Sequence, residues 1–549
     1  MKKVRLYPVV QAITGTTPRG GGTWRWILRH PEAGIFARNL PAMVQALHFK
    51  DYGSVSPQAL ERWRAKPLRA WYNGELGLDY RAPLFVDSGG YLFLSGPPPS
   101  LERYGIHRPL DILRLALDLV DGPGDRVTPL DYPLPPGLPE EEALARLRRT
   151  RENALEGLRY LARHEKGERG VGLVLPVHGR TPEEAAAFAR SLVEAAQREG
   201  FLHLVAALGL GSMVPLRKAH RTEEIVAFAQ AVKRAVPHLP LHVFGVTGLL
   251  IPFLVAAGAD TFDTTGYVQK ARALKYLLPG SYRERRLWDL LEEKGRYPCA
   301  CPACRGRDLA EDLTVLRNPE AERGTKSPVY GAVALHNLEV DLAILREAER
   351  RTAAGELWDY LQELVEAHPR LKKVLEYLEG KRRVTLAPGR KIQNDPEAFD
   401  WRRTGWRPQA EVLLLVPCAA EKPYTQARSV RPVLEAVRGL PVDVVFLSGL
   451  YGPVPLEFVE HPAVLAYDFL LRKGDKESYR RIRERLLPLL GFYRHRVAYL
   501  APPAYREVVQ GLPVTLLPKK AKGLYTGRRK ENLAELRQVL ESALERELI

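Results

Sequence analysis

The chain has 549 residues, with 82 Lys or Arg against 65 Asp or Glu, which gives a net charge of +17 and a pI of about 9.6. Hydrophobic residues make up 45% of the sequence, a share that excludes a disordered chain. Four cysteines in this length also exclude a secreted scaffold stapled by disulfides. The length predicts several domains, or one large barrel with smaller units beside it.

The sequence has no run of about 18 apolar residues, so we expect no transmembrane helix and no membrane partner. The opening segment MKKVRLYPVVQAITGTT lacks an adequate apolar core and a cleavage site, and is typical of a first strand rather than of a signal peptide. Both features predict a cytoplasmic protein. The excess of positive charge favours a polyanionic partner such as nucleic acid. The dense ion pairs of heat-adapted proteins are an alternative explanation.

Short strand-like runs alternate with amphipathic helical stretches over about 250 residues of the first half. The predicted strands are 82–90, 127–133, 171–179, 203–211 and 241–248, and the predicted helices are 140–165, 181–200 and 222–236. Thr181, which precedes acidic residues, is a helix N-cap signal. The alternation predicts a parallel α/β fold, and its length fits a TIM (β/α)8 barrel, in which functional side chains gather at the C-terminal ends of the strands.

The second half begins with a helical stretch at 340–380, and the following segment at 381–409 is interpreted as a linker because it is rich in Pro, Arg and Asn. Predicted strands at 411–417, 442–449 and 496–503, with a helix at 477–493, then indicate a smaller α/β domain. A basic turn and an amphipathic helix end the sequence. We therefore expect three regions: a barrel over 1–345, a helical connector and linker over 346–409, and an α/β domain over 410–549.

Three of the four cysteines lie close together in PCACPAC, and a histidine follows in VALHNLEV. Thiolates this dense in a reducing compartment are typical of metal ligands. Three thiolates and one imidazole form a closed tetrahedral zinc site, which leaves no position for water and is therefore structural. The alternatives are buried cysteines without metal and a histidine that only packs. The sequence predicts a structural Zn²⁺ ion held by Cys299, Cys301, Cys304 and His336.

Three carboxylates lie at or near the ends of predicted strands. Asp87 stands in FVDSGGYLF, Asp131 in PLDYPLPPG and Asp263 in GADTFDTTGY. Taken singly, each is explained better by a turn that an Asp side chain caps. Taken together, they suit a reaction with an oxocarbenium-like transition state, in which one carboxylate acts as nucleophile or stabiliser and another as acid/base.

These segments resemble the tRNA-guanine transglycosylase family in four motifs that follow the family's order. CACPAC with LHNL is similar to its zinc motif, most closely in the archaeosine type. DSGGY at 87–91 resembles its DSGGF signature, GADTFD at 258–263 its G-x-D-x-F-D segment, and LDYPLPP at 130–136 the segment whose Asp reads the base. The resemblance covers about 1–345. It implies a TIM barrel with a zinc-binding insertion, and exchange of a guanine in tRNA for a 7-substituted 7-deazaguanine.

The resemblance also implies a role for each matching residue. Asp263 would be the nucleophile that attacks C1′ and holds a covalent glycosyl-enzyme intermediate, and Asp87 would be the general acid/base for the leaving and incoming bases. Asp131 would accept hydrogen bonds from the base edge, and Tyr91 and Phe244 would sandwich the base. Ordinary barrel core is the alternative for Phe244. The other residues expected at the substrate are Ser88, His178, Gly209 and Gly211.

Two positions depart from the family's pattern. The glutamine that follows DSGGF in the family is Leu92 here, and the V-Q-G segment is Val177–His178–Gly179. Both glutamines help the family to read the heterocycle, and a site that changes its polar groups changes which ring edge it accepts. His178 is then either a contact of the incoming base or a strand-end histidine that faces water.

A second resemblance concerns the α/β domain. PCAAEKPYTQARS at 417–429 is similar to the PC-x3-KPY motif of archaeosine synthase, an amidine-forming relative of the transglycosylases. Cys418, Lys422 and Tyr424 match this motif. Its later Ser and His positions are Ala427 and Val430 here, which counts against amidine formation. From the residues alone, a cysteine at a strand end near a lysine is either a reactive thiolate or a small buried residue.

Four functions fit these observations. The first is base exchange on tRNA, with tRNA and a 7-deazaguanine base as partners, and the second is the same exchange on DNA. The third is a barrel kept as an RNA-binding module, which the presence of Asp87 and Asp263 disfavours. The fourth is a two-step enzyme whose second domain modifies the inserted base. The resemblance further implies a homodimer, and the basic segment 519–530 is a candidate for contacts with the nucleic-acid backbone.

Overall fold

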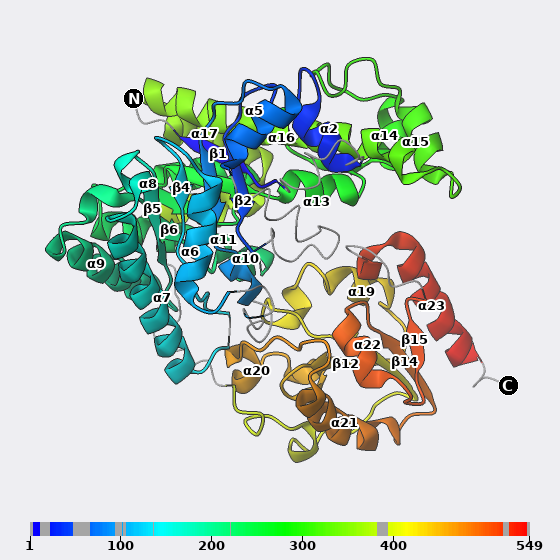
Figure 1. The fold of residues 1–549 in the computed structure, drawn as a ribbon. Coiled ribbons are helices and arrows are strands. Elements are labelled where there is room, and N and C mark those ends of the chain that lie inside the picture. The colour runs from blue at the N-terminus through cyan, green and yellow to red at the C-terminus, as the bar shows by residue number, and fades with distance from the viewer. Residues whose placement is uncertain are drawn as a thin grey trace. The chain divides into compact units, whose positions relative to one another are not determined.

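The computed structural model describes residues 4–10, 22–47, 66–93, 102, 106–135, 137–219, 221–380, 394–519 and 526–545. The chain forms two compact units (Figure 1). Unit 1 comprises Met1–Pro135 and Glu140–Leu386, and unit 2 comprises Pro136–Pro139 and Ala387–Ile549. Each unit has its own hydrophobic core.

Unit 1 is built on a sheet of eight parallel strands in the part of the chain that the structure describes. The strands run in the order β1-β8-β7-β6-β5-β4-β3-β2. An isolated parallel bridge between Val9 and Met43 joins the two outer strands, so the sheet closes on itself. The predicted TIM barrel is confirmed. The strands are β1 (Arg5–Pro8), β2 (Ala42–Gln45), β3 (Leu84–Asp87), β4 (Arg126–Val127), β5 (Gly172–Val177), β6 (Val205–Leu210), β7 (Leu241–Val243) and β8 (Thr261–Thr264).

Side chains inside the barrel form a small cluster separate from the core between strands and helices. Its members include Tyr7, Phe85 and Val174, with Phe244 packed against them. Because successive side chains of a strand point to opposite faces, a residue two positions after an inward one points inward again. Asp87 thus follows the inward Phe85 on β3. The same spacing brings side chains at the C-terminal strand ends over the filled interior, where barrels of this kind carry their chemistry.

The outer helices bury one face each against the strands. Helix α7 (Glu140–Leu161) buries side chains three or four positions apart: Ala143, Leu147, Thr150, Ala154, Leu158 and Leu161. Helix α9 (Pro182–Arg198) begins as predicted, because the Thr181 side chain accepts a hydrogen bond from the backbone N–H of Glu184 at 3.1 Å. Other helices of this layer are α6 (Pro109–Leu119), α11 (Thr222–Ala235), α12 (Ile251–Ala256) and α13 (Gly266–Arg272), of which α6, α11 and α13 are labelled in Figure 1.

One predicted strand is mostly wrong. The run 127–133 contributes only Val127 to β4, and the residues after it have no strand pairing. Pro129 and Pro133 have no N–H to donate to a ladder, which explains why the strand stops early. The early stop leaves Asp131 on a loop rather than on a strand.

The helical stretch after the barrel belongs to unit 1 rather than to a connector. Helix α16 (Arg323–Ala354) is continuous across the boundary predicted at 345, and α17 (Leu357–Ala367) and α18 (Lys372–Leu378) follow it. Leu338, Leu345, Leu361 and Val374 are buried in the same core as the barrel. Among the described residues, no helix has the length and apolar character needed to cross a membrane.

An insertion of short elements precedes α16. It contains the antiparallel pair β9 (Lys275–Leu277) and β10 (Glu284–Arg286), then α14 (Leu287–Lys294) and α15 (Leu309–Arg317). The loop between α14 and α15 carries the three clustered cysteines.

Unit 2 contains a five-stranded sheet in the order β13-β12-β11-β14-β15, in which only β13 is antiparallel to its neighbour. The predicted smaller α/β domain is confirmed. The strands are β11 (Val412–Pro417), β12 (Asp443–Ser448), β13 (Gly452–Pro455), β14 (His495–Tyr499) and β15 (Thr515–Leu517). The helices are α19 (Arg431–Ala436), α20 (Pro462–Ala466), α21 (Lys476–Leu490), α22 (Pro503–Val509) and α23 (Lys530–Glu545).

The segment interpreted as a linker is part of this second core where the structure describes it, from residue 394 onwards. Phe399 and Trp401 are buried there. The buried Arg485 of α21 donates hydrogen bonds to the carbonyl oxygens of Pro396 and Phe399 at 2.7 and 3.0 Å. It also lies 3.8 Å from the carboxylate of Asp400. The low periodicity that suggested a linker therefore reflects an irregular segment held by one buried guanidinium.

Candidate active site and metal centre

Asp87 ends β3 and is nearly buried. Its carboxylate accepts a hydrogen bond from the backbone N–H of Gly89 and another from the hydroxyl of Thr128, both at 3.1 Å. Burial, helped by the nearby carboxylates of Asp131 and Asp263, raises the pKa of Asp87 to about 7, although the two hydrogen bonds act to lower it. A carboxyl group that titrates near neutrality can both give and take a proton at physiological pH.

Asp263 lies on β8 and is held through one of its two oxygens. Its Oδ1 accepts a hydrogen bond from the backbone N–H of Gly245 at 2.8 Å and lies 3.3 Å from Nε2 of His242. Gly245 has a φ of 68°, a left-handed conformation that glycine adopts without strain. Within the described residues, no hydrogen bond to Oδ2 is found, so this oxygen is left for a reacting group.

Asp131, on the loop after β4, is bound through both carboxylate oxygens. The Ser88 hydroxyl donates to Oδ1 at 3.0 Å, and Nε2 of His178 lies 2.8 Å from Oδ2. Nδ1 of His178 lies 3.0 Å from the hydroxyl of Ser212, which itself accepts from the backbone N–H of Leu134 at 2.9 Å. The Ser212 proton is therefore available for Nδ1, and Nε2–H can donate to Asp131.

His178 is only 1% exposed. The alternative that it faces water is therefore wrong. Gly211 makes room for its ring, because a Cβ at that position would overlap Cε1 of His178. Gly209 does the same for Phe244, whose Cε2 would lie 2.7 Å from an added Cβ. Both glycines thus leave room for the ring of a neighbouring side chain.

The two predicted aromatic partners differ in their surroundings. Phe244 is half-buried and packs on the barrel interior, with its ring centroid 5.9 Å from that of Phe85 and 4.4 Å from that of His242. Tyr91 lies on the short 3-10 helix Gly90–Phe93 that follows the Asp87 turn, and it is 45% exposed. Part of the Tyr91 ring therefore faces solvent.

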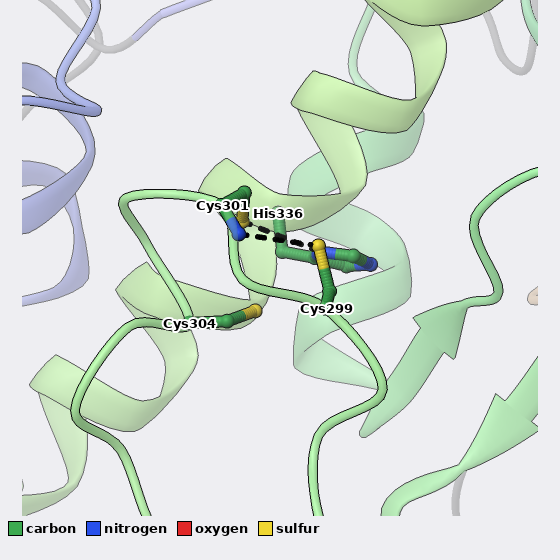
Figure 2. Close-up of side chains that lie close together, drawn as sticks. All are labelled: Cys299, Cys301, Cys304 and His336. Atoms are coloured by element: carbon green, nitrogen blue, oxygen red, sulfur yellow. Dashed lines mark hydrogen bonds between the residues drawn. The ribbon is translucent and has the colours of Figure 1, made fainter.

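The three cysteines and His336 lie together, with their ligand atoms all within 4.8 Å of one another (Figure 2). His336, on α16, donates from Nε2 to the carbonyl oxygen of Leu277 at 2.7 Å, since a carbonyl can only accept. Its Nδ1 therefore keeps a lone pair, and it lies 3.6 Å from Sγ of Cys301. The hydrogen bond from Nε2 to the carbonyl oxygen of Leu277 is the usual support of a histidine that binds a metal through its other nitrogen. The donor set fits a tetrahedral metal ion.

The second-domain candidates also lie close together, at the C-terminal end of β11. Sγ of Cys418 is 3.0 Å from the hydroxyl of Tyr505. Nζ of Lys422 donates to the carbonyl oxygen of Ala419 at 2.7 Å and lies 4.4 and 4.0 Å from the ring centroids of Tyr424 and Tyr467. Cys418 is half-buried, which differs from a small residue fully enclosed in a core.

Several residues of these sites were not predicted. Thr128, His242 and Ser212 each hold a predicted residue in place, and Tyr467 and Tyr505 do so in unit 2. A polar ring within the apolar run LHVFGV was the available signal for His242. The hydroxyl partners carry no such signal, because serine and threonine are common in loops and strands alike.

Comparisons with known proteins match each unit to a family. The family model described as Queuine tRNA-ribosyltransferase matches residues 124–370. The family model described as Domain of unknown function (DUF5591) matches residues 399–538.

The chain is also similar to archaeal proteins named tRNA-guanine(15) transglycosylase. It is 29% identical to the one from Archaeoglobus fulgidus over 502 residues, which cover 86% of this chain and 91% of the relative. It is 30% identical to the one from Methanopyrus kandleri over 56% of this chain and 59% of the relative. The relative from Thermococcus onnurineus is 30% identical over 55% of this chain and 46% of its own length. The chain thus spans about half the length of the last two relatives.

The similarity thus falls on a (β/α)8 barrel that carries acidic side chains at its C-terminal strand ends. The barrel is similar to the queuine tRNA-ribosyltransferase family over 124–370, and the second unit is similar to a domain family of unknown function over 399–538.

Proposed function

We propose that the chain exchanges a guanine base in tRNA for a 7-substituted 7-deazaguanine through a covalent aspartyl-glycosyl intermediate. The observation that carries the proposal is the pairing of two unlike carboxylates on one barrel rim. Asp87 has a pKa of about 7, whereas Asp263 is held by two donors on one oxygen and keeps the other for reaction. A base-exchange reaction needs one carboxyl group that moves a proton and one that attacks carbon.

In the first half-reaction, Oδ2 of Asp263 attacks C1′ of the target nucleoside. The bond between C1′ and N9 of guanine breaks, and its electron pair leaves with the base. Asp87, in its protonated form, donates a proton to the leaving guanine. The products are free guanine and an ester between Asp263 and the ribose.

In the second half-reaction, Asp87 takes a proton from the incoming base, whose ring nitrogen attacks C1′ from the face that guanine left. The ester bond breaks, and its electron pair returns to the Asp263 carboxylate. Asp131 reads the base edge in both halves, and Ser88 and His178 fix its orientation. Tyr91 and Phe244 supply aromatic faces for the base, and the backbone near Gly209 and Gly211 completes the wall.

We expect the release of guanine to depend on pH through Asp87. Its raised pKa means that the proton needed by the leaving base is present below about pH 7 and is lost above it. The rate of the first half-reaction should therefore be flat below pH 7 and fall about tenfold per pH unit above it. Asp87→Asn should lower the rate by about 10²- to 10⁴-fold and remove this alkaline limb. A limb that persists in the variant would assign the titration to another group.

We propose Zn²⁺ as the ion at the cluster of three cysteines and one histidine. With four protein ligands the ion has no open position, so its role is structural and no step of the exchange passes through it. Cys299, Cys301 and Cys304 would tie their loop to α16 through His336. We further propose a homodimer, in line with the resemblance.

The test is incorporation of labelled guanine into purified bulk tRNA and, in parallel, into duplex DNA. Incorporation into tRNA supports the proposal. Incorporation into DNA alone would move the activity to a DNA substrate, which remains the alternative. Incorporation into neither, by folded protein, would contradict base exchange and leave the barrel as an RNA-binding scaffold.

A second candidate function concerns unit 2. We infer that its strand-end cluster modifies a base that the barrel has inserted, since a half-exposed thiol, a lysine and a tyrosine hydroxyl meet at the end of β11. Nucleosides released from tRNA after incubation with the intact protein are weighed by mass spectrometry. Cys418→Ala should keep base exchange and abolish any further mass change of the inserted base. Identical products from the variant and the original protein would exclude this role.

A further inference from the structure

The nucleophile candidate Asp263 touches a histidine that none of the preceding steps uses. His242 lies on β7, next to β8, and is completely buried. Its ring packs edge-on against Phe85, with centroids 5.1 Å apart, and against Phe244. A titratable ring in an apolar barrel interior costs desolvation free energy unless its nitrogens are hydrogen-bonded. Both nitrogens of His242 have hydrogen-bond partners on β8.

These partners determine where the ring carries its proton. Nδ1 lies 2.9 Å from the hydroxyl of Thr261, and Nε2 lies 3.3 Å from Oδ1 of Asp263. A carboxylate oxygen can only accept, whereas a threonine hydroxyl can donate. The arrangement is satisfied when Thr261 donates to Nδ1 and Nε2–H donates to Asp263. Burial lowers the pKa of His242, which keeps the ring neutral in this tautomer.

From this geometry we propose that His242 is a positioning residue that holds Oδ1 of Asp263 and thereby promotes the departure of the Asp263 carboxylate from C1′. The inference rests on the proposed function and deepens it. His242 and the N–H of Gly245 both bind Oδ1, so the rotation of the carboxylate is fixed and Oδ2 is the attacking oxygen.

The same two donors have unequal effects on the two half-reactions. In the resting enzyme and after the second half-reaction, Oδ1 belongs to a charged carboxylate, and hydrogen bonds to it are strong. In the glycosyl ester, Oδ1 is a neutral carbonyl oxygen, and the same hydrogen bonds are weaker. The donors therefore stabilise the free carboxylate relative to the ester. Their loss should leave the ester longer-lived.

The experiment follows the covalent adduct between the intact protein and bulk tRNA on denaturing gels. The adduct is first allowed to form, and excess guanine is then added as the incoming base. In His242→Phe, which keeps a ring but no donor, we expect a larger adduct fraction and an adduct that disappears about 10- to 100-fold more slowly, the factor that one hydrogen bond to a charged group represents. In His242→Gln, whose amide N–H can reach the same oxygen, we expect a rate near that of the original protein.

Two further variants separate positioning from packing. Tyr7→Phe changes another ring of the same interior cluster, 6.3 Å from His242, and should leave the adduct unchanged. Thr261→Val removes the hydroxyl that fixes the tautomer and should slow adduct breakdown severalfold, a result that does not depend on whether His242→Phe folds. Thr261→Ser, which keeps the hydroxyl, should break the adduct down at the original rate.

Breakdown at the original rate in both Thr261→Val and His242→Phe would overturn the inference and leave the proposed function intact. A folded original protein that forms no adduct with tRNA or DNA would instead overturn the proposed function, and this inference with it.

Discussion

Asp263→Asn should lower base exchange by at least about a thousandfold and abolish the covalent adduct with tRNA. The amide oxygen of Asn can still accept from Gly245 and His242, so the side chain should keep its place. An amide nitrogen in the position of Oδ2 cannot attack C1′, and loss of a nucleophile is among the most costly changes to an enzyme. The measurement is incorporation of labelled guanine, with a denaturing gel for the adduct. Affinity for tRNA should change by less than about twofold.

The matched control is Asp260→Asn, three positions earlier in the same segment. Asp260 accepts a hydrogen bond from the backbone N–H of Leu241 at 2.8 Å and pairs with Lys233 at 3.2 Å, at the other end of the strand from the rim. An amide oxygen keeps the first contact, and a partly exposed ion pair contributes about 1 kcal/mol or less. Exchange should therefore remain. Full turnover by Asp263→Asn, or equal losses in both variants, would show that Asp263 is not the nucleophile.

The strand and helix alternation of the sequence was sufficient to predict the barrel, because long amphipathic helices and buried strands give strong periodic signals. The N-cap at Thr181 was predicted correctly because a threonine before acidic residues is a strong local signal. Short strands were missed, for instance β2 (Ala42–Gln45) and β15 (Thr515–Leu517), since three or four residues give too little pattern to detect. The segment after residue 394 looked like a linker because its order comes from Arg485, 85 or more positions away.

The residues of the candidate site were likewise only partly predictable from the sequence. The sequence predicted Asp87, Asp131 and Asp263 because each of them stands in a short, recognisable motif. Their partners come from neighbouring strands and loops, and spacing along the sequence carries no information about them. Asp131 and His178 are 47 positions apart, and Thr128 reaches Asp87 across 41 positions. The substitution of a histidine for the family's glutamine could be seen in the sequence, but only the structure shows that both of its nitrogens are occupied.

The cluster of three cysteines and one histidine is drawn from two separate segments of unit 1. The three cysteines lie on an irregular loop between α14 and α15, whereas His336 lies inside α16, which packs on the barrel. Tyr276 of β9 stacks on His336 with centroids 3.7 Å apart, and its hydroxyl lies 3.5 Å from Sγ of Cys304. Tyr297, Ala303 and Cys304 of this loop are buried in the core of unit 1. A bound ion would therefore add a direct tie between the loop and α16 to an insertion that already packs on the barrel core.

Cys301→Ser should remove the metal and destabilise the insertion by several kcal/mol, since structural zinc contributes about 10–16 kcal/mol of binding free energy in small zinc domains. The original protein should contain one zinc per chain by elemental analysis, and a strong chelator should lower its melting temperature. Hydrogen exchange should rise over 295–317 and change little in the barrel strands. Cys418→Ser is the matched control, because its thiol lies in unit 2 beside Tyr505 and should leave zinc content and melting temperature unchanged. A folded original protein without metal, or equal effects of both variants, would show that the cysteine cluster binds no structural ion.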